Sequence, residues 1–164
     1  MGGELGQAEE WNEDRQINWQ LTEGDAPGRG VQSWVRDLNR LYRSEPALWN
    51  ADFVEAGFEW VNCNDRDTTV LSFLRRDKFG TVVLLIVINF TPVPRNGYRV
   101  GVPATGRWDE LLNSDAAAYG GTNLGNDGSR ETVRQPADGF EQSLVIELPP
   151  LGIVIFRLTN LPLQ

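Results

Sequence analysis

From Phe58 onward the chain is a series of short apolar runs separated by turn residues, and this pattern constrains its fold more than any other feature. The runs are rich in Val, Ile, Leu, Phe and Trp and span residues 58–64, 69–76, 82–90, 98–102, 107–113, 131–135, 143–148 and 152–158. Turn residues separate them at 65–67, 79–80 and 95–97, and Asn96-Gly97 is the clearest hairpin signal. Short strands at this spacing are typical of an antiparallel β-sandwich, so the sequence predicts a mainly β fold.

A helical pattern precedes these runs. Apolar residues recur at positions 31, 34, 35, 38, 41 and 42, which places them on one face of an amphipathic helix. Pro46 cannot continue a helix, so we expect this one to end near Glu45. Burying the apolar face would contribute roughly 10 kcal/mol as an upper bound. The face therefore needs a partner to pack against.

Composition excludes several kinds of chemistry. The chain has no histidine and one cysteine, Cys63, which removes His general bases, Ser-His-Asp and Cys-His systems, and zinc sites built from His or Cys clusters. A net charge of −8 argues against nucleic-acid binding. No membrane-length apolar run and no secretion signal are present, so we expect a soluble protein in a reducing cytoplasm. The 164 residues are too few for a complete (β/α)8 barrel, which needs about 250.

The first nineteen residues, MGGELGQAEEWNEDRQINW, have the composition of a binding loop inside a domain. Four later segments, residues 34–42, 70–76, 89–103 and 148–158, follow them in order. Together the five segments resemble the bacterial 1,4-alpha-glucan (glycogen) branching enzymes of the alpha-amylase superfamily. Two positions depart from that family's usual pattern, with Glu13 in place of His and Asn18 in place of Asp.

The resemblance implies two parts. Residues 1–47 would be a remnant of the last βα unit of a catalytic barrel, opening with the end of a strand, and residues 48–164 would be the C-terminal β-sandwich domain. The helix at Val31–Tyr42 would pack on the barrel in that family, although packing on the sandwich itself is equally open. For the isolated chain, we expect self-association through this helix or a poorly ordered first 45 residues.

The resemblance also implies a function. Branching enzymes transfer a segment of α-1,4-glucan to an O6 hydroxyl, forming an α-1,6 branch during glycogen biosynthesis, and they use no metal or organic cofactor. The nucleophile, the acid/base and the third aspartate of that family all lie upstream of the segment that aligns with Met1. We therefore expect no catalytic residue in this chain, no activity from the chain alone, and an α-glucan such as glycogen or amylose as its partner.

Five residues are candidates for substrate binding. Glu4 resembles the acid at the end of the last barrel strand and would orient the loop and sugar contacts, or else brace the loop by binding backbone amides. The rim of a glucan cleft would hold Gln7, Trp11, Asn12 and Trp19, because flat rings stack on sugars and amides bind hydroxyls. For the two tryptophans, the alternative is a role as core anchors.

Several other side chains have a simpler interpretation. A second glucan-binding face could use Trp49, Trp60, Tyr98, Trp108 and Tyr119, although aromatic residues on strands usually fill the core. We expect solvated surface charges at residues 9, 10, 65, 67, 109 and 110. The Gly-rich stretch 121–128 lacks the strand and helix that flank a phosphate-binding loop, which indicates a tight surface loop.

Two further functions remain open from the sequence. The chain could be a free-standing carbohydrate-binding module, or the tail of a related trehalose-releasing glycoside hydrolase. The GGELGQ, EWN and INW pattern favours the branching enzymes over the hydrolases.

Overall fold

The computed structural model describes residues 2–10, 12–24 and 27–159. Within them, one long helix, α1 (Pro27–Ser44), precedes a β domain. The strands are β1 (Phe58–Asp65), β2 (Val70–Arg76), β3 (Val83–Asn89), β4 (Arg95–Val102), β5 (Arg107–Asn113), β6 (Ser129–Glu131), β7 (Gln142–Leu148) and β8 (Ile153–Leu158). Short 3-10 helices are η1 (Gly3–Leu5), η2 (Trp19–Thr22), η3 (Pro46–Leu48), η4 (Glu55–Gly57) and η5 (Ala117–Tyr119).

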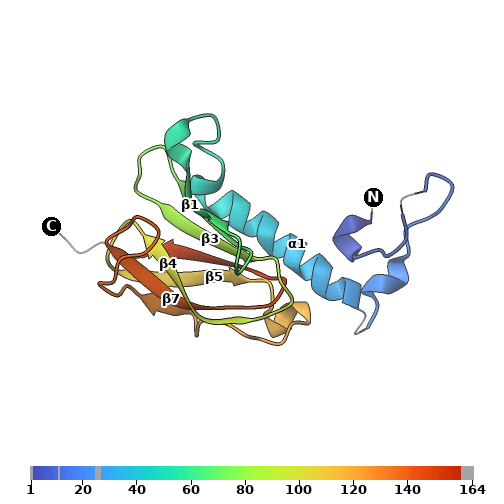
Figure 1. Ribbon diagram of the computed structural model, residues 1–164. Coiled ribbons are helices and arrows are strands. Elements are labelled where there is room, and N and C mark those ends of the chain that lie inside the picture. Colours follow the sequence, from blue (N-terminus) through green and yellow to red (C-terminus); the bar gives the residue numbers. More distant parts are fainter. Residues whose placement is uncertain (1, 11, 25–26, 160–164) are drawn as a thin grey trace.

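The strands form two antiparallel sheets that face each other (Figure 1). One has six strands in the order β1-β2-β3-β8-β5-β6, and the other pairs β4 with β7. Apolar side chains from both sheets meet in a core that includes Leu85, Trp108, Ile146 and Phe156. Period-two burial along the strands produces this core, for example on β2, where Val70, Ser72 and Leu74 are buried. The predicted mainly β sandwich is confirmed.

One turn prediction is wrong. Asn96-Gly97 does not close a hairpin between β3 and β4, because the two strands belong to different sheets. The pair lies inside β4, where the register with β7 shifts between Arg95 and Tyr98 and Gly97 has φ 65°. The positive φ of Gly97 allows a β-bulge at this point, and the bulge bends the strand. The strand expected at 131–135 is displaced, since β6 (Ser129–Glu131) shares only Glu131 with that run.

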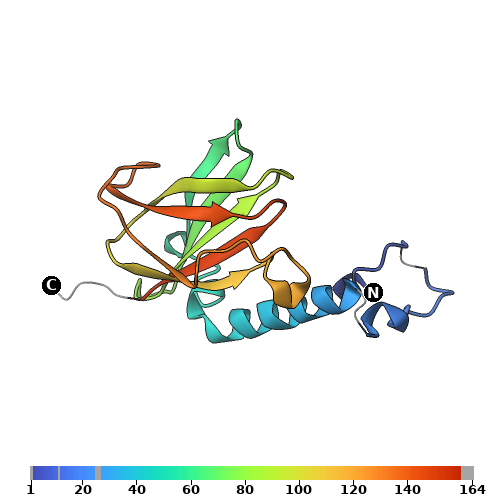
Figure 2. The same cartoon turned by 90° about the horizontal axis from the view of Figure 1, so that it is seen from below.

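The helix packs on the outer face of the six-stranded sheet (Figure 2). Leu38 and Leu41 contact a second apolar cluster that includes Leu84, Ile86 and Ile155. Of the two partners left open by the sequence, the sheet is therefore the one present in this structure. Helix α1 also begins at Pro27, four residues before the apolar pattern starts, because proline is favoured in the first turn of a helix.

The residues before the helix contain no strand in the ranges 2–10 and 12–24. The expected strand end is replaced by η1, whose flanking amides bond locally: the Leu5 and Gly6 N–H groups donate to the carbonyls of Gly2 and Gly3 at 3.1 and 3.2 Å. A lone segment without a neighbouring strand must satisfy its backbone in this way. Both η1 and η2 contact α1, and the segment extends past the helix, away from the sandwich (Figure 2). None of the helices in the described residues is long and apolar enough to cross a bilayer.

Candidate functional site

The segment before α1 folds around a small pocket of about 170 Å³. It is lined by residues 7–10, 12, 15–18 and 21. The pocket brings together Gln7 and Asn12, two of the five candidate binding residues. Amide, carboxylate and guanidinium side chains line the pocket together with Ala8, Ile17 and Leu21.

Gln7 and Asn12 play different parts in this pocket. The Gln7 Nε2 donates to the Glu9 carbonyl at 3.3 Å, whereas its Oε1 is buried and has no hydrogen-bond partner among the described residues. Asn12 accepts the Asp14 amide at 2.8 Å through Oδ1 and so braces its own turn. Of these two side-chain oxygens, Gln7 Oε1 is thus the one without a hydrogen bond among the described residues.

The other candidates lie outside the pocket. Glu4 is exposed on η1 and does not line the pocket. Trp19 begins η2 with its side chain 60% exposed, which removes its alternative role as a core anchor. Asn18 caps η2 by accepting the Gln20 amide at 3.2 Å, so this departure from the family pattern has a local structural role. Trp11 lies outside the described residues.

A second candidate surface lies on the outer face of the six-stranded sheet. Trp60 of β1 is half exposed and meets Phe58 at 5.0 Å and Phe73 at 5.8 Å between ring centroids, in edge-on contacts. Phe58 stacks on Phe73 at 5.3 Å. We call Phe58, Trp60 and Phe73 the aromatic cluster. It adjoins an open apolar groove of about 430 Å³ between α1 and the sheet, since Phe73 also lines that groove.

Sequence reasoning found only part of this surface. Phe58 and Phe73 were missed, although Phe58 and Trp60 stand two apart on one strand and must share a face. Trp108 is fully buried in the core. Tyr98 donates to Asp65 Oδ2 at 2.9 Å, and Tyr119 donates to Asp37 Oδ2 at 3.0 Å. These three aromatic residues are structural, as their position on or beside strands indicated.

Two carboxylates expected to be solvated are structural instead. Asp65 accepts the Thr68 amide at 3.0 Å and the hydroxyls of Thr68 and Tyr98, which closes the turn after β1. Burial acts to raise the pKa of Asp65, but these hydrogen bonds outweigh it and hold the pKa below its usual value. Glu110 accepts the Asn126 amide at 2.9 Å and the Asn126 Nδ2 at 3.1 Å.

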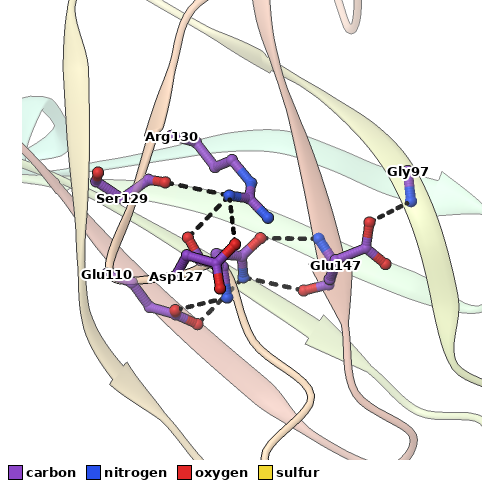
Figure 3. Close-up of polar contacts among 7 residues, drawn as sticks. Gly97, Glu110, Asp127, Ser129, Arg130 and Glu147 are labelled. Carbon is purple, nitrogen blue, oxygen red and sulfur yellow. Dashed lines mark hydrogen bonds and ion pairs between the residues drawn. The ribbon is translucent and has the colours of Figure 1, made fainter.

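Asn126 bonds to groups of both sheets. Figure 3 labels the residues around it, among them Glu110, Arg130 and Glu147. Asn126 is fully buried, and its side chain also exchanges two bonds with the backbone of Glu147: Nδ2 donates to the carbonyl at 3.1 Å, and Oδ1 accepts the amide at 2.8 Å. Arg130 donates to the Asn126 carbonyl at 2.9 Å. Because Glu110 belongs to β5 and Glu147 to β7, the loop 121–128 fastens one sheet to the other. It is a surface loop, as predicted, but its Asn126 side chain is buried and bonds to both sheets. We call these bonds of Asn126 the clamp.

No group of three or more metal-ligating side chains converges in the part of the chain that the structure describes.

The fold is thus an antiparallel two-sheet domain behind a helix, which defines the class as an all-β sandwich domain. Residues 60–159 match the family model described as the alpha amylase C-terminal all-beta domain, and the chain belongs to this family. The resemblance stated from the sequence is confirmed.

The chain is also similar to individual proteins whose names are known. The chain is 47% identical over 157 residues to the 1,4-alpha-glucan branching enzyme GlgB of Aquifex aeolicus (strain VF5), which covers 96% of this chain and 25% of that protein. It is 48% identical over 157 residues to the enzyme of the same name from Thiobacillus denitrificans (strain ATCC 25259 / T1), and this match covers 96% of this chain and 21% of that protein. A solved MutB mutant in complex with sucrose is 21% identical, with a TM-score of 0.48, over 87% of this chain and 21% of that one. The chain thus spans about a fifth to a quarter of the length of these relatives.

Proposed function

We propose that this chain is the carboxy-terminal part of a 1,4-alpha-glucan branching enzyme, which transfers α-1,4-glucan segments to O6 hydroxyls and so makes α-1,6 branches in glycogen. One observation carries the proposal: the similarity to branching enzymes extends over 157 residues. The general family model covers only residues 60–159, so the similarity must include α1 and the segment before it. Those are the parts that would border a catalytic domain.

In this function the chain does not supply the catalytic carboxylates. It supports the catalytic domain and contributes Gln7, with Glu4, Trp11, Asn12 and Trp19, to the rim of the glucan cleft. Glycogen in bacteria is made in the cytoplasm, and the chain would act there. No cofactor is required for the reaction as proposed.

The aromatic cluster is the surface of the sandwich that we propose to contact glucan. A half-exposed indole next to two phenyl rings offers a flat apolar face, and sugar rings present matching apolar faces between their hydroxyls. The packing against Phe58 and Phe73 holds the Trp60 ring in place, so binding costs little side-chain entropy.

The test compares the isolated chain with the protein that includes the region upstream of it. Each sample is titrated with glycogen and maltoheptaose and is then assayed for branching of amylose. We expect branching from the longer protein alone, with α-1,6 linkages in the product. Branching by the isolated chain would contradict the placement of the catalytic residues, and release of trehalose by the longer protein would assign it to the hydrolases instead.

Glycogen binding by the isolated chain tests the aromatic cluster. Trp60→Ala is expected to weaken it about tenfold, the usual effect of losing an aromatic anchor. Phe79→Ala, which removes an exposed ring on the β2–β3 connection, serves as the control and should leave affinity unchanged. Equal affinities for the two variants would contradict the assignment of this surface.

We also propose that the isolated chain self-associates through the exposed side of the helix at Val31–Tyr42. Tyr42 is about half exposed at its C-terminal end, and a neighbouring domain would cover it in the longer protein. Sedimentation velocity at several concentrations tests this, and a monomer throughout would contradict it.

A further inference from the structure

The loop that follows α1, residues 49–57, presents apolar side chains to solvent at an unusual density. Phe53 is fully exposed, and Trp49 and Val54 are about half exposed. Isolated apolar side chains are normal on a protein surface, but a phenylalanine without any covering contact at the tip of a loop gains nothing from the fold that carries it. Its placement therefore needs a reason outside this domain.

The loop is held in position from within by Arg75 of β2. The Arg75 Nε donates to the Gly57 carbonyl at 3.1 Å, and one Nη donates to the Leu48 carbonyl at 3.3 Å. The same guanidinium pairs with the Asp52 carboxylate. One side chain thus fastens the beginning, the middle and the end of the loop. It also neutralises the acid next to Phe53.

Packing rigidifies the loop further. Ala51 and Gly57 are buried against each other, so closely that a β-carbon on Gly57 would clash with the Ala51 carbonyl oxygen. On the outer side, Asn50 Oδ1 accepts the Lys78 amide at 3.1 Å, which ties the loop to the β2–β3 connection. A rigid loop that displays an exposed ring is preorganised for binding, because little conformational entropy remains to be lost.

The shape of the display favours a protein partner over a sugar. A stacking platform lies flat and has hydroxyl-binding groups around it, whereas Phe53 projects as a knob with its neighbouring charge paired. Such knobs enter pockets on folded domains and act as hot spots of the interface. The loop follows α1 after the short η3 and leads into β1, so it lies at the border between the sandwich and whatever precedes it in the chain. Relatives that match 96% of this chain are four to five times as long, which provides a folded partner of the required size.

We propose that the loop 49–57 is the anchor through which the sandwich seats on the upstream catalytic domain, with Phe53 as the side chain that enters it. This inference rests on the proposed function, because it requires that domain to be present. Arg75 is the residue that positions the anchor.

The experiment uses the longer protein with three sequences: wild type, Phe53→Ala, and Phe79→Ala as the control. Phe79 is also a strongly exposed phenylalanine, on the adjoining β2–β3 connection, but the Arg75 contacts do not hold it. Limited proteolysis measures the rate at which the sandwich is released from the catalytic domain. Phe53→Ala is expected to increase that rate at least tenfold, and Phe79→Ala to leave it unchanged. In the isolated chain, neither variant should change the unfolding temperature, because neither ring is covered there.

Three results would overturn the inference. Release of the Phe53→Ala variant at the wild-type rate would show that the knob is not at an interface. A change in oligomeric state without faster release would identify a second copy as the partner, and weaker glycogen binding without faster release would identify a glucan. The linkage of the products made by the wild-type protein is measured separately, so a failure of the branching function is distinguishable from a failure of the anchor.

Discussion

Replacing Asn126 with alanine tests whether the clamp between the two sheets is a main source of stability. The substitution removes three hydrogen bonds made by a fully buried side chain. Two of them join the backbone amide and carbonyl of Glu147, at 2.8 and 3.1 Å, and the third ends on the Glu110 carboxylate at 3.1 Å. The amide and carbonyl of Glu147 would lose these contacts, and Glu110 would keep only its bond from the backbone amide of residue 126.

The expected loss follows from these bonds. A hydrogen bond between neutral groups contributes about 1 kcal/mol, and one to a charged group about 2 kcal/mol, so the free energy of unfolding should fall by about 4 kcal/mol. That is a large share of the roughly 5–15 kcal/mol that stabilises a typical domain. For a chain of this length, it corresponds to a decrease of about 10 °C in Tm.

Urea and thermal unfolding of the isolated chain, followed by circular dichroism, measure this loss. Asp127→Asn is the matched control, since its carboxylate is 94% exposed and lies 3.7 Å from Arg130. A surface pair of this kind contributes little, so the control should change the free energy of unfolding by less than about 0.5 kcal/mol. A loss below about 1 kcal/mol for Asn126→Ala, or equal losses for both variants, would refute the reasoning.

Two further predictions concern β4 and the turn after β1. Gly101→Ala should destabilise the sandwich by about 2 kcal/mol or more, because the new methyl group would meet the Ala137 carbonyl oxygen; an unchanged urea midpoint would contradict this. The pKa of Asp65 is lower in the folded chain than in the unfolded one, so its contribution is present above about pH 4 and is lost as the pH falls through the folded value. Tyr98→Phe removes one of the bonds that lower this pKa and should reduce the loss of stability between about pH 5 and pH 2; an identical pH profile would contradict it.

Much of the fold could be predicted because its signals are local. Short apolar runs between turn residues placed the strands, and helical spacing placed Leu38 and Leu41 on the buried side of α1. The failures share one cause, which is that pairing partners are not local. Asn96-Gly97 has the composition of a hairpin turn, yet β4 pairs with β7, more than forty residues away. The strand end expected before Gly6 had no neighbour to pair with.

The candidate site shows the same division. The first segment supplied the candidate binding residues, and the structure places two of them, Gln7 and Asn12, around one pocket. The partner rings of Trp60 were missed, because Phe73 comes from a different strand and only the β1–β2 register brings it alongside. The exposed Phe53 was missed as well, since nothing in the sequence shows whether an aromatic side chain is covered.

By itself, the sequence determined the class of this protein: an antiparallel sandwich behind an amphipathic helix, without histidine or thiolate chemistry, and with the motifs of the branching enzymes. These properties depend on composition, on short apolar runs between turn residues and on the helical period of 3.6 residues, which are readable along the chain. Only the tertiary structure decided which carboxylates are structural, that Asn126 joins the two sheets, and which aromatic rings reach solvent. Those properties depend on contacts between residues far apart in sequence, and burial exists only once such contacts have formed.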